Sequence, residues 1–198
     1  YRSDIGINDN TFVYCCFSKS KKIQYQDFKL WMDLLLENEN SCLWLLESNQ
    51  ISKFNMIQTA IEMGVEEKRI IFSTSVDLGD HISRQKCADL MLDTFNFSSG
   101  VMTSLALKSG LPVITFPGKT FSSRLSASIL SSLNLTELIA TSKEDYKNKA
   151  LELSKNRTIE PIKAKIISLQ KKSPYFKSQS YCDNLEKIYE GITNDYEY

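Results

Sequence analysis

A short polar turn between two apolar segments is the stretch of this sequence best suited to holding an anion. The apolar run at residues 90–92 (LML) is followed by residues 98–100 (SSG), and a helical pattern then extends from about Val101 to Ser109. The first N–H groups of a helix have no carbonyl partners within it and carry a partial positive charge, so this turn leads into a potential anion site. The same residues also fit an ordinary capped turn, because such clusters are common between regular elements.

Cationic side chains elsewhere in the chain are further candidates for ligand contacts. Lys19 and Lys22 follow the apolar run at residues 11–17, where they are either phosphate ligands or part of a solvated charge run. His81 and Arg84 are three residues apart and therefore share one helical face. That pair either clamps a ligand, with the imidazole stacking and the guanidinium donating a fork of N–H groups, or lies at a solvated helix end.

Other kinds of chemistry find little support in the sequence. No Ser/His/Asp or Cys/His arrangement, Walker sequence or GxGxxG is present, which argues against a P-loop or NAD-type enzyme. The five cysteines lack CxxC spacing and His81 is the only histidine, so we expect reduced, mostly buried thiols and no metal site. We expect Asp93 to cap or orient the loop after residue 92 and not to act as a catalytic base. Arg124 is either a second anion ligand or a member of a surface pair.

The elements that position these residues alternate along the chain. Predicted buried strands, with a short edge strand last, cover residues 11–17, 42–46, 69–72, 90–92, 113–116 and 137–140. Predicted helices cover residues 27–38, 52–63, 80–88 and 101–109, one helix capped by Ser122, and residues 143–155, 159–172 and 180–189. This alternation predicts an α/β fold, a doubly wound, Rossmann-like parallel sheet followed by C-terminal helices. The carboxyl ends of its strands share one edge, where open α/β sheets bind ligands.

Length and charge restrict the organisation and the partners. At 198 residues the chain is long enough for one well-buried domain, or at most two small ones. We expect residues 1–10 to be a linker or the end of an upstream element, and residues 11–198 to form the lobe, with C-terminal helices at about 143–192. Lys+Arg and Asp+Glu both number 24, so no net field attracts nucleic acid or an anionic membrane. No apolar run is long enough to span a bilayer and the N-terminus is not a signal peptide, so we expect a cytoplasmic protein.

Several motifs in one order resemble a known enzyme family. They are LDT (92–94), GLPV (110–113), PG (117–118) and SR (123–124), within the longer runs CFSKSKKI (16–23), CLWLLES (42–48), RIIFS (69–73), DHISRQKCADLMLDT (80–94), SGLPVITFPGKTFSSRLSASIL (109–130), ELIATSKEDYKNKALEL (137–153) and SPYFKSQSYCDNLEKIYEGI (173–192). Together they resemble the O-linked N-acetylglucosamine transferase family, which includes plant SPINDLY-type and bacterial tetratricopeptide-linked enzymes. The resemblance extends from about Phe12 to Ile192.

The resemblance implies the C-terminal, donor-binding lobe of an inverting GT-B glycosyltransferase. Such an enzyme transfers a sugar, here expected to be N-acetylglucosamine from a UDP-sugar, to Ser or Thr of a protein without a metal cofactor. The acceptor would be held by an upstream catalytic lobe. Neither this lobe nor the family's tetratricopeptide array has a counterpart in these residues.

The family's nucleotide-binding positions can be matched to residues of this chain. Lys22 matches the phosphate-binding lysine, which would stabilise the leaving group, and Lys19 stands at a glutamine position in the same loop. His81 and Arg84 match base contacts. The diphosphate site at a helix start, His-Thr-Thr in the family, is occupied here by Gly100, Val101 and Met102.

Further departures affect the expected donor contacts. Leu105 stands where the family has an acidic ribose ligand, and Leu78 stands where it has a lysine ahead of the histidine. Two other readings therefore stay open: a GT-B transferase acting on lipid or carbohydrate, and a degenerate lobe that binds nucleotide or a partner without turnover.

We also expect His81 and Arg84 to line the base end of the cleft whose diphosphate end is Gly100. His81 follows the third strand and Gly100 follows the next strand in sequence. If those strands are neighbours, they are about 5 Å apart at the same edge of the sheet.

Overall fold

The centre of the protein is a five-stranded parallel sheet, seen in a computed structural model that describes residues 2–155 and 158–194. Its strands are β1 (Phe12–Cys16), β2 (Ser41–Leu46), β3 (Ile70–Ser73), β4 (Leu90–Leu92) and β5 (Val113–Ile114), in the order β3-β2-β1-β4-β5. Every neighbouring pair is parallel, with Tyr14 of β1, for example, beside both Leu43 of β2 and Leu90 of β4. The predicted fold class is therefore confirmed.

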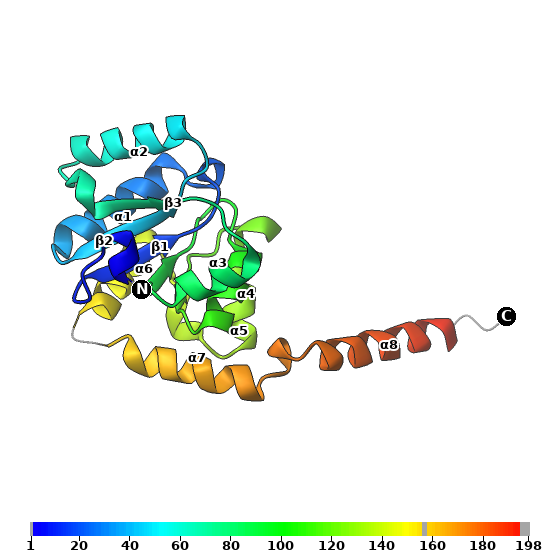
Figure 1. The fold of residues 1–198 in the computed structure, drawn as a ribbon. Helices are drawn as coiled ribbons and strands as arrows, with labels where there is room; N and C mark the ends of the chain where they lie inside the picture. The colour runs from blue at the N-terminus through cyan, green and yellow to red at the C-terminus, as the bar shows by residue number, and fades with distance from the viewer. Residues whose placement is uncertain (1, 156–157, 195–198) are drawn as a thin grey trace.

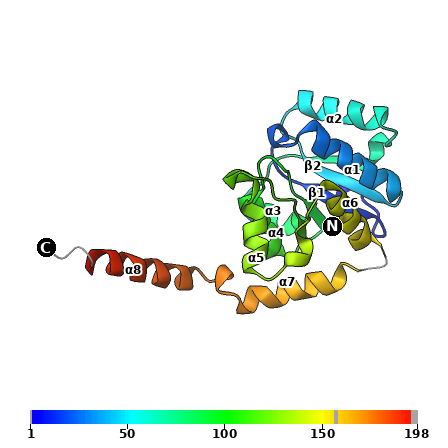
Figure 2. The same ribbon diagram turned by 180° about the vertical axis from the view of Figure 1, so that it is seen from behind.

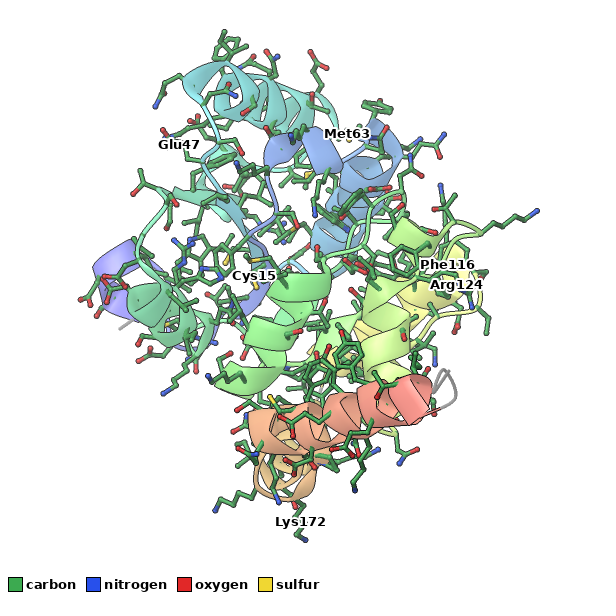
Figure 3. All side chains as sticks on the ribbon, turned by 90° about the vertical axis from the view of Figure 1, so that its right-hand side faces the viewer. Cys15, Glu47, Met63, Phe116, Arg124 and Lys172 are labelled. Atoms are coloured by element: carbon green, nitrogen blue, oxygen red, sulfur yellow. The ribbon has the colours of Figure 1, made fainter. Side chains whose placement is uncertain are left out.

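Helices cover both faces of the sheet, which explains why its strands are continuous apolar runs. The helices of the body are α1 (Tyr25–Glu37), α2 (Gln50–Glu62), α3 (Leu78–Gln85), α4 (Gly100–Ser109), α5 (Leu125–Ser132) and α6 (Lys143–Ser154). Helices α1 and α2 lie on one face with α6 beside α1, and α3, α4 and α5 lie on the other (Figures 1 and 2). A strand buried on both faces cannot alternate between polar and apolar residues. Cys15, inside this body, is fully buried (Figure 3).

Local signals account for several helix ends. The side chain of Ser142 accepts a hydrogen bond from the backbone of Asp145 at 3.0 Å, so it caps α6 as predicted. Gly110 ends α4 in the left-handed region, at φ +86°, where a side chain would be strained. All five cysteines are free, and three of them are buried, as expected.

Two sequence predictions about the segment after β5 are wrong. Residues 137–140 do not form an edge strand, because a 3-10 helix (Thr136–Leu138) leaves only an isolated bridge between Thr115 and Ile139. Ser122 does not cap α5, which begins at Leu125 after another 3-10 helix (Phe121–Ser123). The carbonyl of Ser122 instead accepts a hydrogen bond from the backbone N–H of Ser98 at 2.9 Å, so this turn is held by the loop after β4.

The first residues and the last helices attach differently to the body. The Arg2 guanidinium, in a 3-10 helix (Arg2–Ile5), bonds Asp89 at 2.7 Å and the Cys87 carbonyl at 3.0 Å. Helix α7 (Glu160–Lys172) runs along the body, with Lys172 at its end (Figures 1 and 3). After a 3-10 helix (Pro174–Phe176), α8 (Ser178–Asn194) projects away from it (Figures 1 and 2).

Two further 3-10 helices, Ser20–Lys22 and Glu67–Arg69, complete the short elements of the described residues. Residues 2–155 and 158–194 contain no helix that is both long and apolar enough to cross a membrane.

Strand order places a switch point between β1 and β4. The chain moves from β1 outward to β3 and then returns to β4 on the other side of β1. The loops after β1 and β4 therefore lead to opposite faces of the sheet, and it is at such a point of the carboxyl edge that open α/β sheets bind ligands. Lys22 belongs to the first of these loops and residues 98–100 to the second.

Candidate functional site

The carboxylate of Asp93 organises the loop after β4. This side chain is fully buried and accepts three hydrogen bonds. They come from the backbone N–H of Ser99 at 2.7 Å, the hydroxyl of Ser98 at 2.9 Å and the hydroxyl of Thr115 at 2.7 Å. The network continues from Ser98 to Ser126 at the start of α5, 2.7 Å away. As expected, Asp93 orients the loop, and it does so by joining the ends of two strands to the starts of two helices.

The start of α4 is left uncapped by its own N-cap residue. Ser99 occupies the N-cap position but makes no side-chain hydrogen bond to the first turn. Its hydroxyl lies instead 2.7 Å from the hydroxyl of Ser18, at the end of β1, so this bond spans the switch point. A side-chain cap ordinarily satisfies one of the free N–H groups of a helix. Here the first turn, with Gly100, Val101 and Met102, keeps those donors and their partial positive charge for another partner.

The Lys22 side chain lies beside the loop that leads into this helix start. Its Nζ atom is 4.0 Å from the centroid of the Phe97 ring, in the loop that leads into α4. Burial lowers the pKa of Lys22, and the nearby charge of Asp93 opposes that effect. Lys19 is exposed and begins the same turn, accepting a hydrogen bond from the Lys22 backbone at 2.9 Å. The structure therefore brings Lys22 to the loop that precedes Gly100, whereas the side chain of Lys19 is exposed to solvent.

His81 and Arg84 form a connected pair on α3, as their spacing predicted. The Nε and Nη2 atoms of Arg84 lie 3.1 and 2.9 Å from Nδ1 of His81. A guanidinium only donates, so Nδ1 accepts from Arg84. The other ring nitrogen, Nε2, lies 2.8 Å from the Nε2 atom of Gln85. Burial, and then the charge of Arg84, lower the pKa of His81 below the ordinary histidine value. The imidazole is therefore neutral at neutral pH.

The surroundings of this pair combine core packing with a cavity. His81 is only 7% exposed and packs edge-on against Phe17, with ring centroids 5.4 Å apart. The Arg84 guanidinium lies 4.5 Å from the centroid of the same ring and donates to the Thr74 carbonyl at 2.8 Å. Arg84 also lines a cavity of about 560 Å³, together with Trp44 and others on β2 and β3. The base-contacting roles of His81 and Arg84 stay predictions.

His81 and Arg84 do approach the switch point, but the predicted reason, that the strands before His81 and Gly100 are neighbours, is wrong. Strands β3 and β4 are not neighbours, because β2 and β1 lie between them. Helix α3 crosses the sheet instead and carries His81 to Phe17, the residue that follows β1. Helix α3 also packs against α4. It is this crossover, and not strand adjacency, that brings the pair toward the Gly100 helix.

Positions that depart from the family pattern are apolar or cramped here. Leu78, the first residue of α3, is 61% exposed, and Val101 is 71% exposed. A Cβ atom added at Gly100 would lie 3.2 Å from Cδ1 of Leu125, so a larger residue there requires the Leu125 side chain to move by a few tenths of an ångström. Leu105 lines a cavity of about 990 Å³ between α4 and the start of α8. Arg124, labelled in Figure 3, donates to the Gly118 carbonyl at 3.0 Å and so stabilises its own turn.

Sequence reasoning missed the residues that hold the site together. Ser18, Phe97, Thr115 and Ser126 were not singled out, although each contacts one of the expected residues or its neighbours. Serine and threonine are too common for their type alone to reveal a network. The available signal was position, because Thr115 and Ser18 come one and two residues after strands at the ligand edge.

Comparison with known proteins agrees with this arrangement. A model of glycosyltransferase family 41 matches residues 1–185. An Arabidopsis thaliana protein, named as a probable UDP-N-acetylglucosamine--peptide N-acetylglucosaminyltransferase SEC, is 28% identical over 195 residues, which are 98% of this chain and 20% of that protein. The chain thus spans about a fifth of the length of that relative.

Two solved structures share the fold. A Thermobaculum terrenum O-GlcNAc transferase mutant superposes with a TM-score of 0.86 and 23% identity, covering 96% of this chain and 37% of the other. Anabaena Alr3699/HepE, in complex with UDP and glucose, gives a TM-score of 0.68 and 16% identity, covering 94% of this chain and 51% of the other. The fold is that of a GT-B glycosyltransferase lobe, and because the family model spans nearly all of the sequence, this chain belongs to glycosyltransferase family 41.

Proposed function

We propose that this chain is the donor-binding lobe of a protein O-glycosyltransferase that transfers N-acetylglucosamine from UDP-N-acetylglucosamine to Ser or Thr. In this proposal the first turn of α4 and Lys22 bind the diphosphate, and His81 and Arg84 are on the side of the base. The name of the Arabidopsis relative and the UDP in the Anabaena complex support the choice of nucleotide.

The observation that carries the proposal is the uncapped start of α4 at the switch point. Helix α4, of 10 residues, begins there, and the hydroxyl of its N-cap residue Ser99 bonds Ser18 instead of the first turn. The Lys22 ammonium group lies next to the loop that leads into this helix. A helix N-terminus and a lysine are complementary to a diphosphate, which carries negative charge on several oxygens. Because the N–H groups belong to the backbone, replacing His-Thr-Thr by Gly100, Val101 and Met102 preserves them.

These groups suggest how the lobe contributes to the reaction. When the bond between the sugar carbon and the diphosphate oxygen breaks, the leaving nucleoside diphosphate gains negative charge. Positive charge placed at that oxygen beforehand stabilises the transition state more than the ground state. Lys22 and the α4 dipole would supply it without a metal ion. The acceptor hydroxyl and the group that removes its proton would come from an upstream lobe, in a cytoplasmic protein with a tetratricopeptide array.

A titration with two ligands tests the proposal. We expect UDP to bind the chain, and Lys22→Met to weaken UDP binding by about 10- to 100-fold, because a hydrogen bond to a charged group contributes about 1.5–3 kcal/mol. Uridine, which lacks phosphate, should bind wild type and variant equally. Lys21→Met, which removes an exposed neighbouring charge, is the matched control. Equal losses for UDP and uridine, or no UDP binding by the wild type, would contradict the proposed site.

One observation favours a second candidate, a lobe that binds nucleotide without turnover. The side chains of Leu105 and Leu78 cannot donate or accept hydrogen bonds, and a Cβ atom at Gly100 would press on the Leu125 side chain at 3.2 Å. UDP binding by the chain, combined with no transfer by the full-length protein, would identify this case.

A further inference from the structure

Phe97 is a half-exposed aromatic residue in the loop before α4, and its ring faces the ammonium group of Lys22. The distance from Nζ to the ring centroid is 4.0 Å, well inside the cation–π range of about 6 Å. The ring is 48% exposed, and a single exposed phenylalanine needs no explanation by itself. The feature that requires an explanation is the contact of this ring with Lys22, the cation that in the proposed function stabilises the leaving group.

The backbone around Phe97 is fixed on both sides. The Thr94 hydroxyl donates to the Phe97 carbonyl at 2.7 Å, and the next N–H, that of Ser98, donates to the Ser122 carbonyl at 2.9 Å. Beyond it, the buried Asp93 carboxylate accepts from the Ser99 backbone. The ring is therefore presented by a rigid loop.

Lys22 reaches the ring from the other side of the switch point. It ends a 3-10 turn whose first residue, Ser20, donates its backbone N–H to the Ser48 hydroxyl at 2.9 Å. The main chain of Lys22 is thus anchored, but its side chain has four flexible bonds that must be ordered when it binds a ligand. A ring face that already confines the ammonium reduces this entropic cost. An ammonium has three N–H donors, so those that do not face the ring stay free to bond an anion.

We propose that Phe97 is a positioning residue, which holds the Lys22 ammonium beside the first turn of α4 so that it meets the diphosphate of the donor without reorientation. The proposal rests on the proposed function of the site and adds a residue to it. Phe97 acts through Lys22, and we do not assign it a contact with the transferred sugar.

The test compares Phe97→Leu, which keeps an apolar side chain without a ring, with Phe97→Tyr, which keeps the ring. We expect Phe97→Leu to weaken UDP binding about two- to fivefold, equivalent to about 0.5–1 kcal/mol, with no change for uridine. Phe97→Tyr should bind UDP with the affinity of the wild type, because it keeps the ring. In a Lys22→Met background, Phe97→Leu should have no further effect, because the partner cation is gone.

A second measurement needs no nucleotide. Reductive 13C-methylation labels the lysines, and the Lys22 signal is the one that Lys22→Arg removes. The Phe97 ring current should displace this signal from those of exposed lysines, and Phe97→Leu should return it to them. An undisplaced signal, an unchanged ratio of UDP to uridine affinity in Phe97→Leu, or an equal loss in the Lys22→Met background would overturn the role of Phe97. If the wild type binds no UDP, the proposed function fails, and this inference fails with it.

Discussion

Replacing Asp93 by asparagine keeps the shape of the side chain and removes its charge. The three hydrogen bonds that Asp93 accepts, from Ser98, Ser99 and Thr115, measure 2.7 to 2.9 Å and lie in the interior. A bond to a charged acceptor contributes about 1.5–3 kcal/mol and a neutral one about 0.5–1.5, so each bond loses about 1 kcal/mol. The amide can still accept from Ser99, and the two hydroxyls can rotate to accept from it.

The expected loss is therefore about 3 kcal/mol of unfolding free energy, as the sum of three such bonds. For a domain of this size, about 2–4 °C of melting temperature corresponds to each kcal/mol, so the midpoint should fall by roughly 6–12 °C. Urea unfolding followed by circular dichroism measures the free energy, and calorimetry measures the midpoint. Thr115→Val removes one of the three donors outright and should cost about 1.5–3 kcal/mol, the contribution of one hydrogen bond to a charged acceptor.

Asp183→Asn on the exposed surface of α8 is the matched control and should change stability by less than about 0.5 kcal/mol. If Asp93→Asn were as stable as this control, the charge on Asp93 would not be what holds the loop. The start of α4 would then be held in place by other contacts.

Three further predictions concern the metal, the histidine and a glycine. Excess EDTA should leave the UDP affinity unchanged in calorimetric titration, and a loss that magnesium restores would refute the metal-free diphosphate site. Folding lowers the pKa of His81, so the unfolded chain binds the proton first as the pH falls below about 6.5. The free energy of unfolding should therefore decrease there, by at most about 1.4 kcal/mol per pH unit. Urea unfolding between pH 7.5 and 5.5 should show this slope, and His81→Gln should lack it; equal slopes would contradict the linkage. Gly118→Ala should cost about 1–3 kcal/mol, because its Cβ would lie 2.9 Å from the Ser123 Cβ, whereas Gly191→Ala meets no atom within 4 Å and should not destabilise in thermal melts. A Gly118→Ala protein as stable as the Gly191→Ala control would show that the turn relaxes.

Sequence periodicity predicted the strands of this fold well, because burial on both faces produces uninterrupted apolar runs such as Leu90–Leu92. It also predicted the end of α4 at Gly110, whose left-handed backbone favours glycine. It could not give the strand order, since the pairing of β4 with β1 depends on contacts between distant segments. The edge strand expected at residues 137–140 failed for a related reason, because a short run of one glutamate and three apolar residues fits a 3-10 turn equally well.

The candidate site was predictable only in part. Lys22 and the start of α4 follow from their places after strands, and the spacing of His81 and Arg84 gave their shared face. The burial of His81 could not be read from the sequence, because it depends on where α3 crosses the sheet and meets Phe17. The pairing of Ser18 with Ser99 likewise joins residues 81 positions apart.

The projection of α8 has a hydrodynamic consequence. Its 17 residues give a rod about 25 Å long, which exceeds the radius of gyration of about 16 Å for a compact chain of this size. The protein should therefore diffuse and sediment more slowly than a sphere of 22.7 kDa. In small-angle scattering, the distribution of interatomic distances should have a long tail, which comes from the rod and not from association of copies.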